Sequence, residues 1–237
     1  MGLRATSGQT VKSAAFNVQI FGKEKVKKSD VMKILVKIFL RYGGAIIQEI
    51  RDKSDEAINA LMDAINTASP TDNFTVHGYA SMVTKQTEFE RSPDCFSLTA
   101  KWSGVRMGYL AVHVSPKSVA KELDALYYVT KECESFANTP NLVLLGDMNA
   151  DCSYITKQAR DNLLLRKDKK YEWRIADTMD TTVSDKPCAY DRVITKGSVL
   201  AGLIPTANPF NFRAEYKLDL PEAKRVSDHY PVEFDIH

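Results

Sequence analysis

Short apolar runs that end in an acid, an amide or an imidazole recur along the chain. Asn17 ends AAFN, Glu49 follows AIIQ and His113 follows YLAV, while Asp147 and Asn149 close NLVLLGDMN. Runs of this length and composition are typical of buried strands. Because several such strands end in groups that bind metals or move protons, the pattern predicts a shared rim on which a site can form.

Amphipathic helical segments lie between these strands. The sequence predicts strands at 13–21, 44–50, 107–114, 141–149, 189–195 and 230–236, and helices from an N-cap at 29–30 to residue 42, near 53–66 and over 116–136. Strands and helices mix without strict βαβ alternation, which favours stacked mixed sheets flanked by helices over a Rossmann or barrel architecture. No proline- or glycine-rich linker divides the chain. We therefore expect a flexible leader at 1–12 and a single α/β domain at 13–237.

The overall charge of the chain limits what it can bind. The 237 residues carry a net charge of only +2 and 26% charged residues, which is typical neither of a nucleic-acid packaging protein nor of a disordered chain. Any DNA binding must then come from a local patch. No apolar run approaches the ~20 residues that span a bilayer, and the opening MGLRATSGQT lacks the apolar core of a signal peptide. The sequence therefore predicts no membrane partner.

The polar strand ends fit the requirements of phosphodiester hydrolysis. Mg²⁺ prefers oxygen ligands, and Glu49 is the leading candidate, with Asp147 and Asn149 able to complete an oxygen-rich site. A base must also activate water and an acid must protonate the departing oxygen, which histidine does near neutral pH. Of the four histidines, His113 and His229 are the two that lie at strand ends.

Asp191 is the carboxylate that we expect to orient His229 and to stabilise its imidazolium, as in the triads of hydrolases. Each of these residues also has an ordinary explanation. A single histidine on a strand is more often a core residue, and a single aspartate in a turn is more often a cap. The case for a site therefore depends on the residues occurring together and in this order.

Six stretches carry a resemblance to a known family. They are AAFNVQIFG, IIQEIRD, LAVHVSPKSVAKELDALY, LLGDMNADCSY, DTTVSDKPCAYDRV and SDHYPVEF, and they run from Ser13 to Phe234. In this combination the chain resembles the deoxyribonuclease I family of the endonuclease/exonuclease/phosphatase superfamily. The resemblance implies a four-layer sandwich of two packed mixed β-sheets flanked by helices, and a metal-dependent endonuclease of low sequence specificity. The ADCSY and CAYDRV stretches argue against other superfamily chemistries, such as the hydrolysis of lipid or inositol phosphates.

The resemblance also implies roles for particular residues. Metal- and phosphate-binding positions correspond to Asn17, Glu49, Asp147, Asn149 and Asp228, the general acid to His113, and the general base to His229, oriented by Asp191. DNA contacts correspond to Arg51, Arg91 and Tyr190, a structural calcium site to Asp180 and Thr182, and the principal disulfide to Cys152 and Cys188. The implied cofactors are Mg²⁺ (or Mn²⁺) and Ca²⁺. The disulfide implies an oxidising compartment, so we expect a secreted or secretory-pathway protein, with a nuclear or cytoplasmic form left open.

The chain departs from the family pattern between Tyr79 and Arg91. The family has a longer segment there, including a strand whose glutamate pairs with the acid histidine, whereas this chain has only ASMVTKQTEFE. Glu88 and Glu90 are available, but their context supports neither of them in that role. We therefore expect one or two inner strands to be missing and His113 to lack an orienting partner. The alternative function is a catalytically impaired or inactive family member that binds DNA or a protein.

The lysine run KEKVKK at 23–28 has two interpretations. The ordinary one is a solvated approach to a helix. The functional one is that Lys23, Lys25, Lys27 and Lys28 contact DNA phosphates beside the minor groove, which would position the protein without reading sequence. Besides DNA, family members bind actin, but part of that surface lies near the shortened segment. We expect a monomer.

Overall fold

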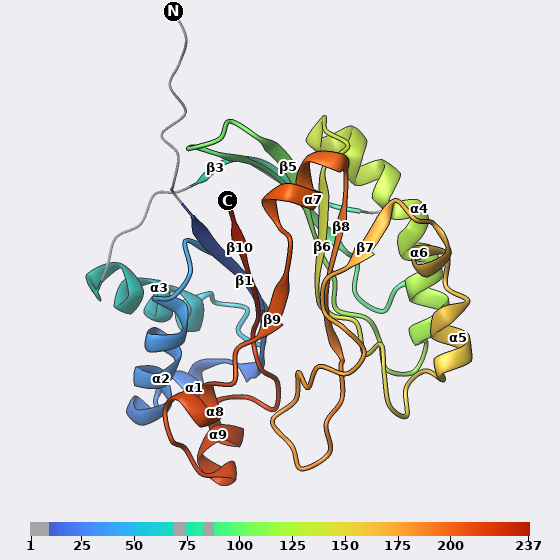
Figure 1. Cartoon of the computed structure of the whole chain (residues 1–237). Coiled ribbons are helices and arrows are strands. Elements are labelled where there is room, and N and C mark those ends of the chain that lie inside the picture. Colours follow the sequence, from blue (N-terminus) through green and yellow to red (C-terminus); the bar gives the residue numbers. More distant parts are fainter. Residues whose placement is uncertain (1–9, 69–73, 83–87) are drawn as a thin grey trace, which may run out of the picture.

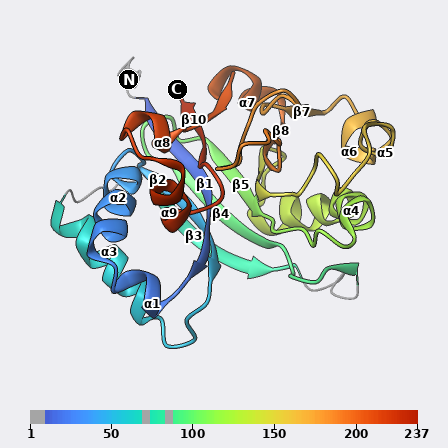
Figure 2. The same ribbon diagram turned by 90° about the horizontal axis from the view of Figure 1, so that it is seen from below.

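The computed structural model describes residues 10–68, 74–82 and 88–237, and these form two β-sheets packed face to face. Helices cover the outer face of each sheet, so the layers run helix, sheet, sheet, helix (Figures 1 and 2). The predicted four-layer α/β sandwich is confirmed. Most of the expected leader falls on residues 1–9, outside the described residues, and the first strand already begins at Val11.

The first sheet is built around one long strand. Its strands, in spatial order, are β2 (Gly44–Ile50), β1 (Val11–Phe21), β10 (Val232–Ile236) and β9 (Ala207–Pro209). β1 pairs in parallel with β2 and antiparallel with β10. Successive side chains of a strand point to opposite faces, so Ala14 and Phe16 pack against helices while Ala15 packs against the other sheet. β1 is therefore buried on both faces from Ser13 to Val18, although this stretch includes the polar residues Ser13 and Asn17.

The second sheet is a continuous ladder in the part of the chain that the structure describes. Its strands, in spatial order, are β3 (Phe74–Ser81), β4 (Asp94–Ala100), β5 (Arg106–Ala111), β6 (Leu142–Asp147), β8 (Asp191–Lys196) and β7 (Tyr171–Trp173). β3 and β4 flank the shortened segment and pair directly, with Ser81 opposite Asp94. The shortening therefore opens no gap inside this sheet. In the first sheet the described strands end at β2, which is an edge strand.

The helices fall into two groups. Those beside the first sheet are α1 (Lys23–Val26), α2 (Ser29–Phe39), α3 (Glu56–Ala68), α8 (Phe212–Glu215) and α9 (Leu220–Val226). Those beside the second sheet are α4 (Val119–Ala137), α5 (Lys157–Asp161) and α6 (Leu164–Lys167), while α7 (Ser198–Leu203) follows β8 at one end of the sandwich (Figure 1). Among the described helices, none is long and apolar enough to cross a membrane.

The two longest apolar stripes show why these segments become helices that pack on sheets. In α2 the buried residues Val31, Leu35 and Ile38 lie four and three positions apart, so they form one face of the helix. α4 is 19 residues long and buries its own stripe against the second sheet. It ends at Asn138, whose φ of 50° is the left-handed conformation that commonly terminates helices.

Most predicted elements are present with shifted ends. α2 ends at Phe39 rather than at residue 42, and its cap position is Lys28, so Ser29 is the first helical residue and not the N-cap. The sequence did not predict the strands β3, β4, β7 and β9, nor the short helices α1, α5, α6, α7, α8 and α9. β7 and β9 have only three residues each, which is too short for a periodic signal.

Two disulfides connect segments around the second sheet. Cys152 is joined to Cys188, the pair implied by the family resemblance, with Cα atoms 5.9 Å apart. A second bridge joins Cys95 of β4 to Cys133 of α4. The sequence did not predict this bridge, and the packing of α4 on the sheet brings the two cysteines together.

Candidate active site

The polar strand ends meet at the rim of the sandwich opposite α7 (Figure 1). Asp147 is the last residue of β6 and lies directly across the ladder from Asp191, the first residue of β8. Glu49 lies near the end of β2 in the other sheet, and His229, just before β10, bridges to Thr182. The groups come from different sheets, so the packing of one sheet on the other is what brings them together.

His229 and Asp191 form a tight pair at this rim. His229 Nδ1 lies 2.8 Å from Asp191 Oδ2, and both residues are buried. The Thr181 hydroxyl accepts hydrogen bonds from the backbone N–H groups of Tyr190 and Asp191, which fixes the start of β8. Burial disfavours the imidazolium, but the carboxylates of Asp191 and Asp147 outweigh it and raise the pKa of His229 to about 10. The arrangement is that of an imidazole held in one orientation by a carboxylate.

Asp147 lies at the centre of the candidate site. Its Oδ2 is 3.6 Å from His113 Nε2 and 3.7 Å from His229 Nε2, and it accepts a hydrogen bond from Asn17 Nδ2 at 3.1 Å. Its Oδ1 accepts the backbone N–H of Asn149 at 3.0 Å. Burial raises the pKa of Asp147, because its charged form has lost its water. A buried carboxylate of this kind is stabilised by a nearby cation.

Glu49 faces the same centre from the first sheet. Its carboxylate accepts hydrogen bonds from the backbone N–H of Ile20 at 2.9 Å and from Asn17 Nδ2 at 3.2 Å. Its Oε1 lies 3.8 Å from His113 Nε2. Burial acts to raise the pKa of Glu49, but these hydrogen bonds outweigh burial and lower it. Glu49 therefore stays ionised beside Asp147.

The carboxylates at the rim fit a divalent cation. Ligand atoms of Asp147, Asp191 and His229 lie within 4.8 Å of one another. Asp228 adds a buried Oδ1 that has no hydrogen-bond partner within the described structure. In that part of the chain the ion-pair partners of these acids are the two histidines rather than lysine or arginine. An oxygen-rich set without a fixed cation matches what Mg²⁺ or Mn²⁺ takes from a protein.

The other predicted ligands reach the rim in different ways. Asn17 donates its side-chain amide to both central acids and so links the two sheets. Asp228 Oδ2 accepts a hydrogen bond from Gln19 Nε2 at 2.8 Å. Asn149 is buried, and its side-chain Nδ2 donates to the carbonyl of Val114 at 2.9 Å. The structure thus brings Asn17 to the acids by its side chain and Asn149 mainly by its backbone. Asp228 lies instead beside His229, whose Nε2 is 3.8 Å from Asp228 Oδ1.

His113 lies two residues beyond β5, with Nε2 directed at the central carboxylates. Burial lowers the pKa of His113, and Arg91 adds to the effect, so the neutral ring is favoured. Glu90, an acid of the shortened segment, accepts instead a hydrogen bond from the Ser115 hydroxyl at 2.5 Å. Among the described residues, no carboxylate is hydrogen-bonded to the His113 ring.

Asp180 and Thr182 belong to a compact loop before β8. Asp180 Oδ1 accepts hydrogen bonds from the backbone and the hydroxyl of Thr182 and from the backbone N–H of Cys188. The hydroxyls of Thr182 and Ser184 lie 3.2 Å apart. The loop is therefore held together by hydrogen bonds to the Asp180 carboxylate, with the two hydroxyl oxygens close to it. It also lines a pocket of about 460 Å³ that reaches His229.

The predicted DNA-contacting residues border the site. Arg51 is exposed just beyond β2. Arg91 donates to the backbone carbonyl of His113 at 3.3 Å, and its side chain is 35% exposed. The Tyr190 ring packs against Tyr154, with centroids 5.1 Å apart. The sequence interpretation did not single out Tyr154, although it ends the ADCSY stretch.

Two further residues that were not singled out set the position of Asp147. Gln48 donates to the carbonyl of Val112 at 2.6 Å and accepts the backbone N–H of Asp147 at 3.0 Å, so it bridges the two sheets. Gly146 has a φ of 128°, and a Cβ at this position would lie 2.3 Å from the Val112 carbonyl oxygen. The glycine of GDMN is therefore required for this close approach of backbone segments.

The lysines at 23–28 do not form a row of free cations. Lys23 pairs with Glu56, and Lys27 pairs with Glu24, on the exposed surface. Lys25 is buried, so neither interpretation of the lysine run, solvent exposure or phosphate contact, holds for this residue. Its ammonium group donates hydrogen bonds to backbone carbonyls inside the protein instead.

Lys25 clamps two segments of the rim. Its ammonium donates to the carbonyls of Val18, Gln19 and Val226 at 2.7, 2.5 and 2.9 Å. The first two belong to β1, which carries Asn17, and the third ends α9, which Asp228 and His229 follow closely in the chain. Burial lowers the pKa of Lys25 to about 8.

Replacing Lys25 with methionine is expected to lower the free energy of unfolding by about 1–3 kcal/mol, because buried carbonyl groups lose their donor. Urea denaturation followed by circular dichroism measures the change. Lys27→Met is the matched control, since Lys27 is exposed and pairs with Glu24 on the surface. An equal loss of stability in both variants would show that the hydrogen bonds of Lys25 do not stabilise the fold.

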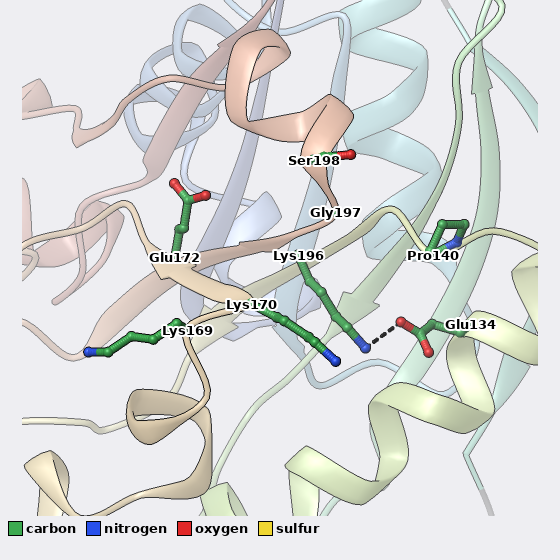
Figure 3. Close-up of a pocket in the computed structure, with 8 residues that line it drawn as sticks. All are labelled: Glu134, Pro140, Lys169, Lys170, Glu172, Lys196, Gly197 and Ser198. Carbon is green, nitrogen blue, oxygen red and sulfur yellow. Dashed lines mark ion pairs between the residues drawn. The ribbon is translucent and has the colours of Figure 1, made fainter.

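A second pocket lies far from this rim. It has a volume of about 530 Å³ and is lined by Lys169, Lys170 and Lys196, with Glu134 paired to Lys196 (Figure 3). β8 runs from Asp191 to Lys196, so this pocket lies roughly 17 Å from the rim acids along the strand. None of its lining residues belongs to the candidate site.

Known proteins resemble this chain over nearly its whole length. The endonuclease/exonuclease/phosphatase family matches residues 14–229. Deoxyribonuclease-1-like 1 of Bos taurus is 32% identical over 262 residues, covering 99% of this chain and 83% of the relative. Deoxyribonuclease-1 of Rattus norvegicus is 31% identical over 258 residues, covering 94% of this chain and 90% of the relative.

Solved structures share the fold at much lower identity. D. rerio TDP2 complexed with a single-strand DNA product is 14% identical with a TM-score of 0.66, covering 97% of this chain and 100% of that one. The mannosyl-6-phosphatase Bt3783 of Bacteroides thetaiotaomicron is 13% identical with a TM-score of 0.59, covering 94% and 98%. These likenesses concern the fold alone. From the family match and the relatives above 30% identity, the chain belongs to the endonuclease/exonuclease/phosphatase family as a deoxyribonuclease I-like member.

Proposed function

We propose that the protein is a metal-dependent endonuclease that hydrolyses DNA phosphodiester bonds with low sequence specificity. The observation that carries the proposal is the 2.8 Å pair of His229 Nδ1 and Asp191 Oδ2, with His229 Nε2 3.7 Å from Asp147. An oriented imidazole beside clustered carboxylates is what metal-assisted phosphodiester hydrolysis needs. The names of the deoxyribonuclease relatives point to DNA as the substrate.

The cation would be held mainly by Glu49 and Asp147. Asp228 would contribute its Oδ1, which accepts no hydrogen bond in the described structure, while Asn17 and Asn149 hold the acids in place through their amide groups. A bound Mg²⁺ or Mn²⁺ would neutralise charge on the phosphate. In the described structure Glu49, Asp147 and Asp228 form ion pairs with histidines and with no lysine or arginine. No side-chain ammonium or guanidinium group would therefore compete with the metal for these three carboxylates.

Two histidines would move the protons. His229 Nε2 accepts a proton from the attacking water, and Asp191 on Nδ1 stabilises the imidazolium that forms. The water oxygen bonds to phosphorus while the bond to the departing oxygen breaks. His113, on the other side of Asp147, gives a proton to that departing oxygen.

Binding of a divalent cation is expected to lower the pKa of His229. Burial opposes the imidazolium, but Asp191 and Asp147 raise the pKa of His229 to about 10 in the metal-free protein, whereas a base must be neutral. A cation beside Asp147 cancels part of that negative charge, so the neutral imidazole becomes more stable. An NMR titration of the imidazole signals with and without Mg²⁺ measures the shift. An unchanged titration in saturating Mg²⁺ would place the cation away from Asp147.

The remaining predicted residues would bind DNA and calcium. Arg51, Arg91 and Tyr190 would contact the DNA backbone, which positions the substrate and carries little sequence information. Asp180 and Thr182 would take part in a structural Ca²⁺ site. The two disulfides support an oxidising compartment and therefore a secreted protein.

A catalytically impaired family member that binds DNA or a protein is the second candidate, and the environment of His113 favours it. Among the described residues no carboxylate bonds to the His113 ring, and burial lowers the pKa of the group that would have to donate a proton. Loss of a well-placed acid costs about 10²–10⁴-fold in rate.

A plasmid-nicking assay tests the proposal. The protein is incubated with supercoiled DNA in Mg²⁺ and Ca²⁺, with an EDTA control. Metal-dependent appearance of nicked circles is the expected result. Supercoiled DNA that survives high concentrations of demonstrably folded protein would favour the second candidate.

A further inference from the structure

Ile20 lies at the rim beside the candidate site and exposes its apolar side chain. The residue is 63% exposed, more than any other large hydrophobic residue in the described part of the chain. Its backbone N–H donates to Glu49 Oε2 at 2.9 Å, so it is next to a carboxylate of the site. A single exposed apolar residue on a surface is ordinary, but this one borders the reacting groups.

The backbone around Ile20 forms a bulge in β1. The pairing of β1 with β2 changes register between Asn17 and Phe21. Within this stretch Gln19 and Ile20 have φ values of 43° and 52°. This left-handed conformation is unfavourable for a β-branched residue, whereas glycine and asparagine adopt it more readily. Bulges beside active sites commonly re-aim a side chain, and here an isoleucine occupies a position that the local backbone disfavours.

Groups other than the Ile20 side chain hold this bulge in place. The buried ammonium of Lys25 donates to the carbonyls of Val18 and Gln19 at 2.7 and 2.5 Å. The backbone N–H of Gln19 donates to Asn17 Oδ1 at 2.9 Å. In the described structure Ile20 belongs to none of the hydrophobic clusters that form the core. Its side chain is therefore fixed at the rim without being used in the core, and its apolar surface is available to a bound ligand.

We propose that Ile20 packs against the deoxyribose beside the phosphate under attack and selects deoxyribose over ribose there. The inference rests on the proposed nuclease function and assigns the residue that senses the sugar. The Ile20 N–H contacts the carboxylate of Glu49, which in that function holds the cation and through it the phosphate, so the attached sugar comes within reach of Ile20. The 2′ carbon of deoxyribose is apolar. A ribose 2′-hydroxyl against isoleucine loses water and gains no hydrogen-bond partner.

Cleavage ladders test the inference. A labelled DNA duplex with single ribonucleotides at known positions is digested in Mg²⁺, and cleavage beside each ribonucleotide is compared with the same position in the all-DNA duplex. The wild type is expected to cleave beside a ribonucleotide about tenfold less, which is below the ~10²-fold by which an enclosed apolar pocket rejects an added hydroxyl. Ile20→Asn, which suits the left-handed conformation, is expected to lose most of this discrimination. Equal discrimination in the wild type and Ile20→Asn, or none in the wild type, overturns the inference.

Val199→Asn is the matched control for this substitution. Val199 is also β-branched and 46% exposed, but it lies on α7, at the end of the sandwich opposite the rim (Figure 1). This variant should discriminate as the wild type does. Thermal melting of both variants shows whether the Ile20 side chain supports the fold. Ile20→Asn should melt no lower than the wild type, because asparagine tolerates the bulge and no core contact is lost. A much lower Tm would give Ile20 a structural role and contradict the inference.

A binding measurement separates failure of the sugar contact from failure of the nuclease. In the His229→Ala background, fluorescence anisotropy in Mg²⁺ gives the affinity for an all-DNA duplex and for the same duplex with ribonucleotides at every second position. The expected result is tighter binding of the all-DNA duplex, a preference that Ile20→Asn removes and Val199→Asn retains. Equal affinities, no binding at all, or a preference that Ile20→Asn leaves intact would each overturn the sugar contact. If the wild type cleaves no DNA, the nuclease proposal fails, and this measurement still decides the role of Ile20.

Discussion

Replacing His229 with alanine is expected to lower the rate of plasmid nicking in Mg²⁺ by about 10²–10⁴-fold, the usual contribution of a positioned acid or base. His229 is the imidazole whose Nδ1 is held by Asp191 at 2.8 Å while its Nε2 faces the central acid. No other described histidine has this arrangement. The rate is measured as loss of supercoiled plasmid at saturating metal.

The control for this substitution is His237→Ala. His237 is exposed at the C-terminus and lies 3.3 Å from the Thr10 hydroxyl, far along the strands from the rim. The His237→Ala variant should nick DNA at the wild-type rate. Thermal melting of both variants establishes that each is folded. Full activity in folded His229→Ala would remove this residue from the proposed mechanism.

Replacing Asp177 with alanine is expected to lower the free energy of unfolding by about 3–5 kcal/mol, because buried positive charges lose their partner. Asp177 binds Arg160, Arg166 and Arg192 at 3.1, 2.5 and 2.8 Å. Arg192 is fully buried, and burial lowers its pKa to about 10. Differential scanning calorimetry should show a Tm lower by roughly 6–20 °C for a chain of this size.

The same charge network supports the rim. Arg160 and Arg192 both donate to the carbonyl of Ala150 at 3.1 Å, immediately after the GDMN stretch. Local loosening of that loop should therefore accompany the lost stability, and hydrogen exchange would detect it. Asp161→Ala is the matched control, since Asp161 pairs on the surface with Lys157. A Tm within error of the wild type for Asp177→Ala would show that the arginines do not depend on it.

The elements that were predicted well have strong local signals. β2 was expected at 44–50 and has those bounds, because its apolar run is short and ends in polar residues. α4 was expected to about residue 136 and ends at Ala137, since its apolar stripe has a helical period. The ends that shifted, such as that of α2 at Phe39, depend on how the chain turns into the next strand.

The candidate site was predictable in part for a different reason. The polar residues beside several predicted strands, Asp147 and Asp191 among them, indicated a shared rim. Because β6 and β8 are antiparallel, the end of β6 lies opposite the start of β8, and this pairing makes the two aspartates neighbours. Gln48 and Gly146 gave no such signal. Gln48 bridges the two sheets by hydrogen bonds, and Gly146 allows their backbones to approach closely. The residues that surround them in the sequence do not indicate either contact.

By itself the sequence determined the family resemblance, the layered fold and the acids, amides and imidazoles at strand ends, because motif order and apolar periodicity are local properties. Only the tertiary structure decided that Lys25 turns inward, that Cys95 pairs with Cys133, and that β3 and β4 pair directly across the shortened segment. Each of these depends on how segments pack in space, and the first two join segments far apart along the chain. Such packing is decided by the whole molecule at once.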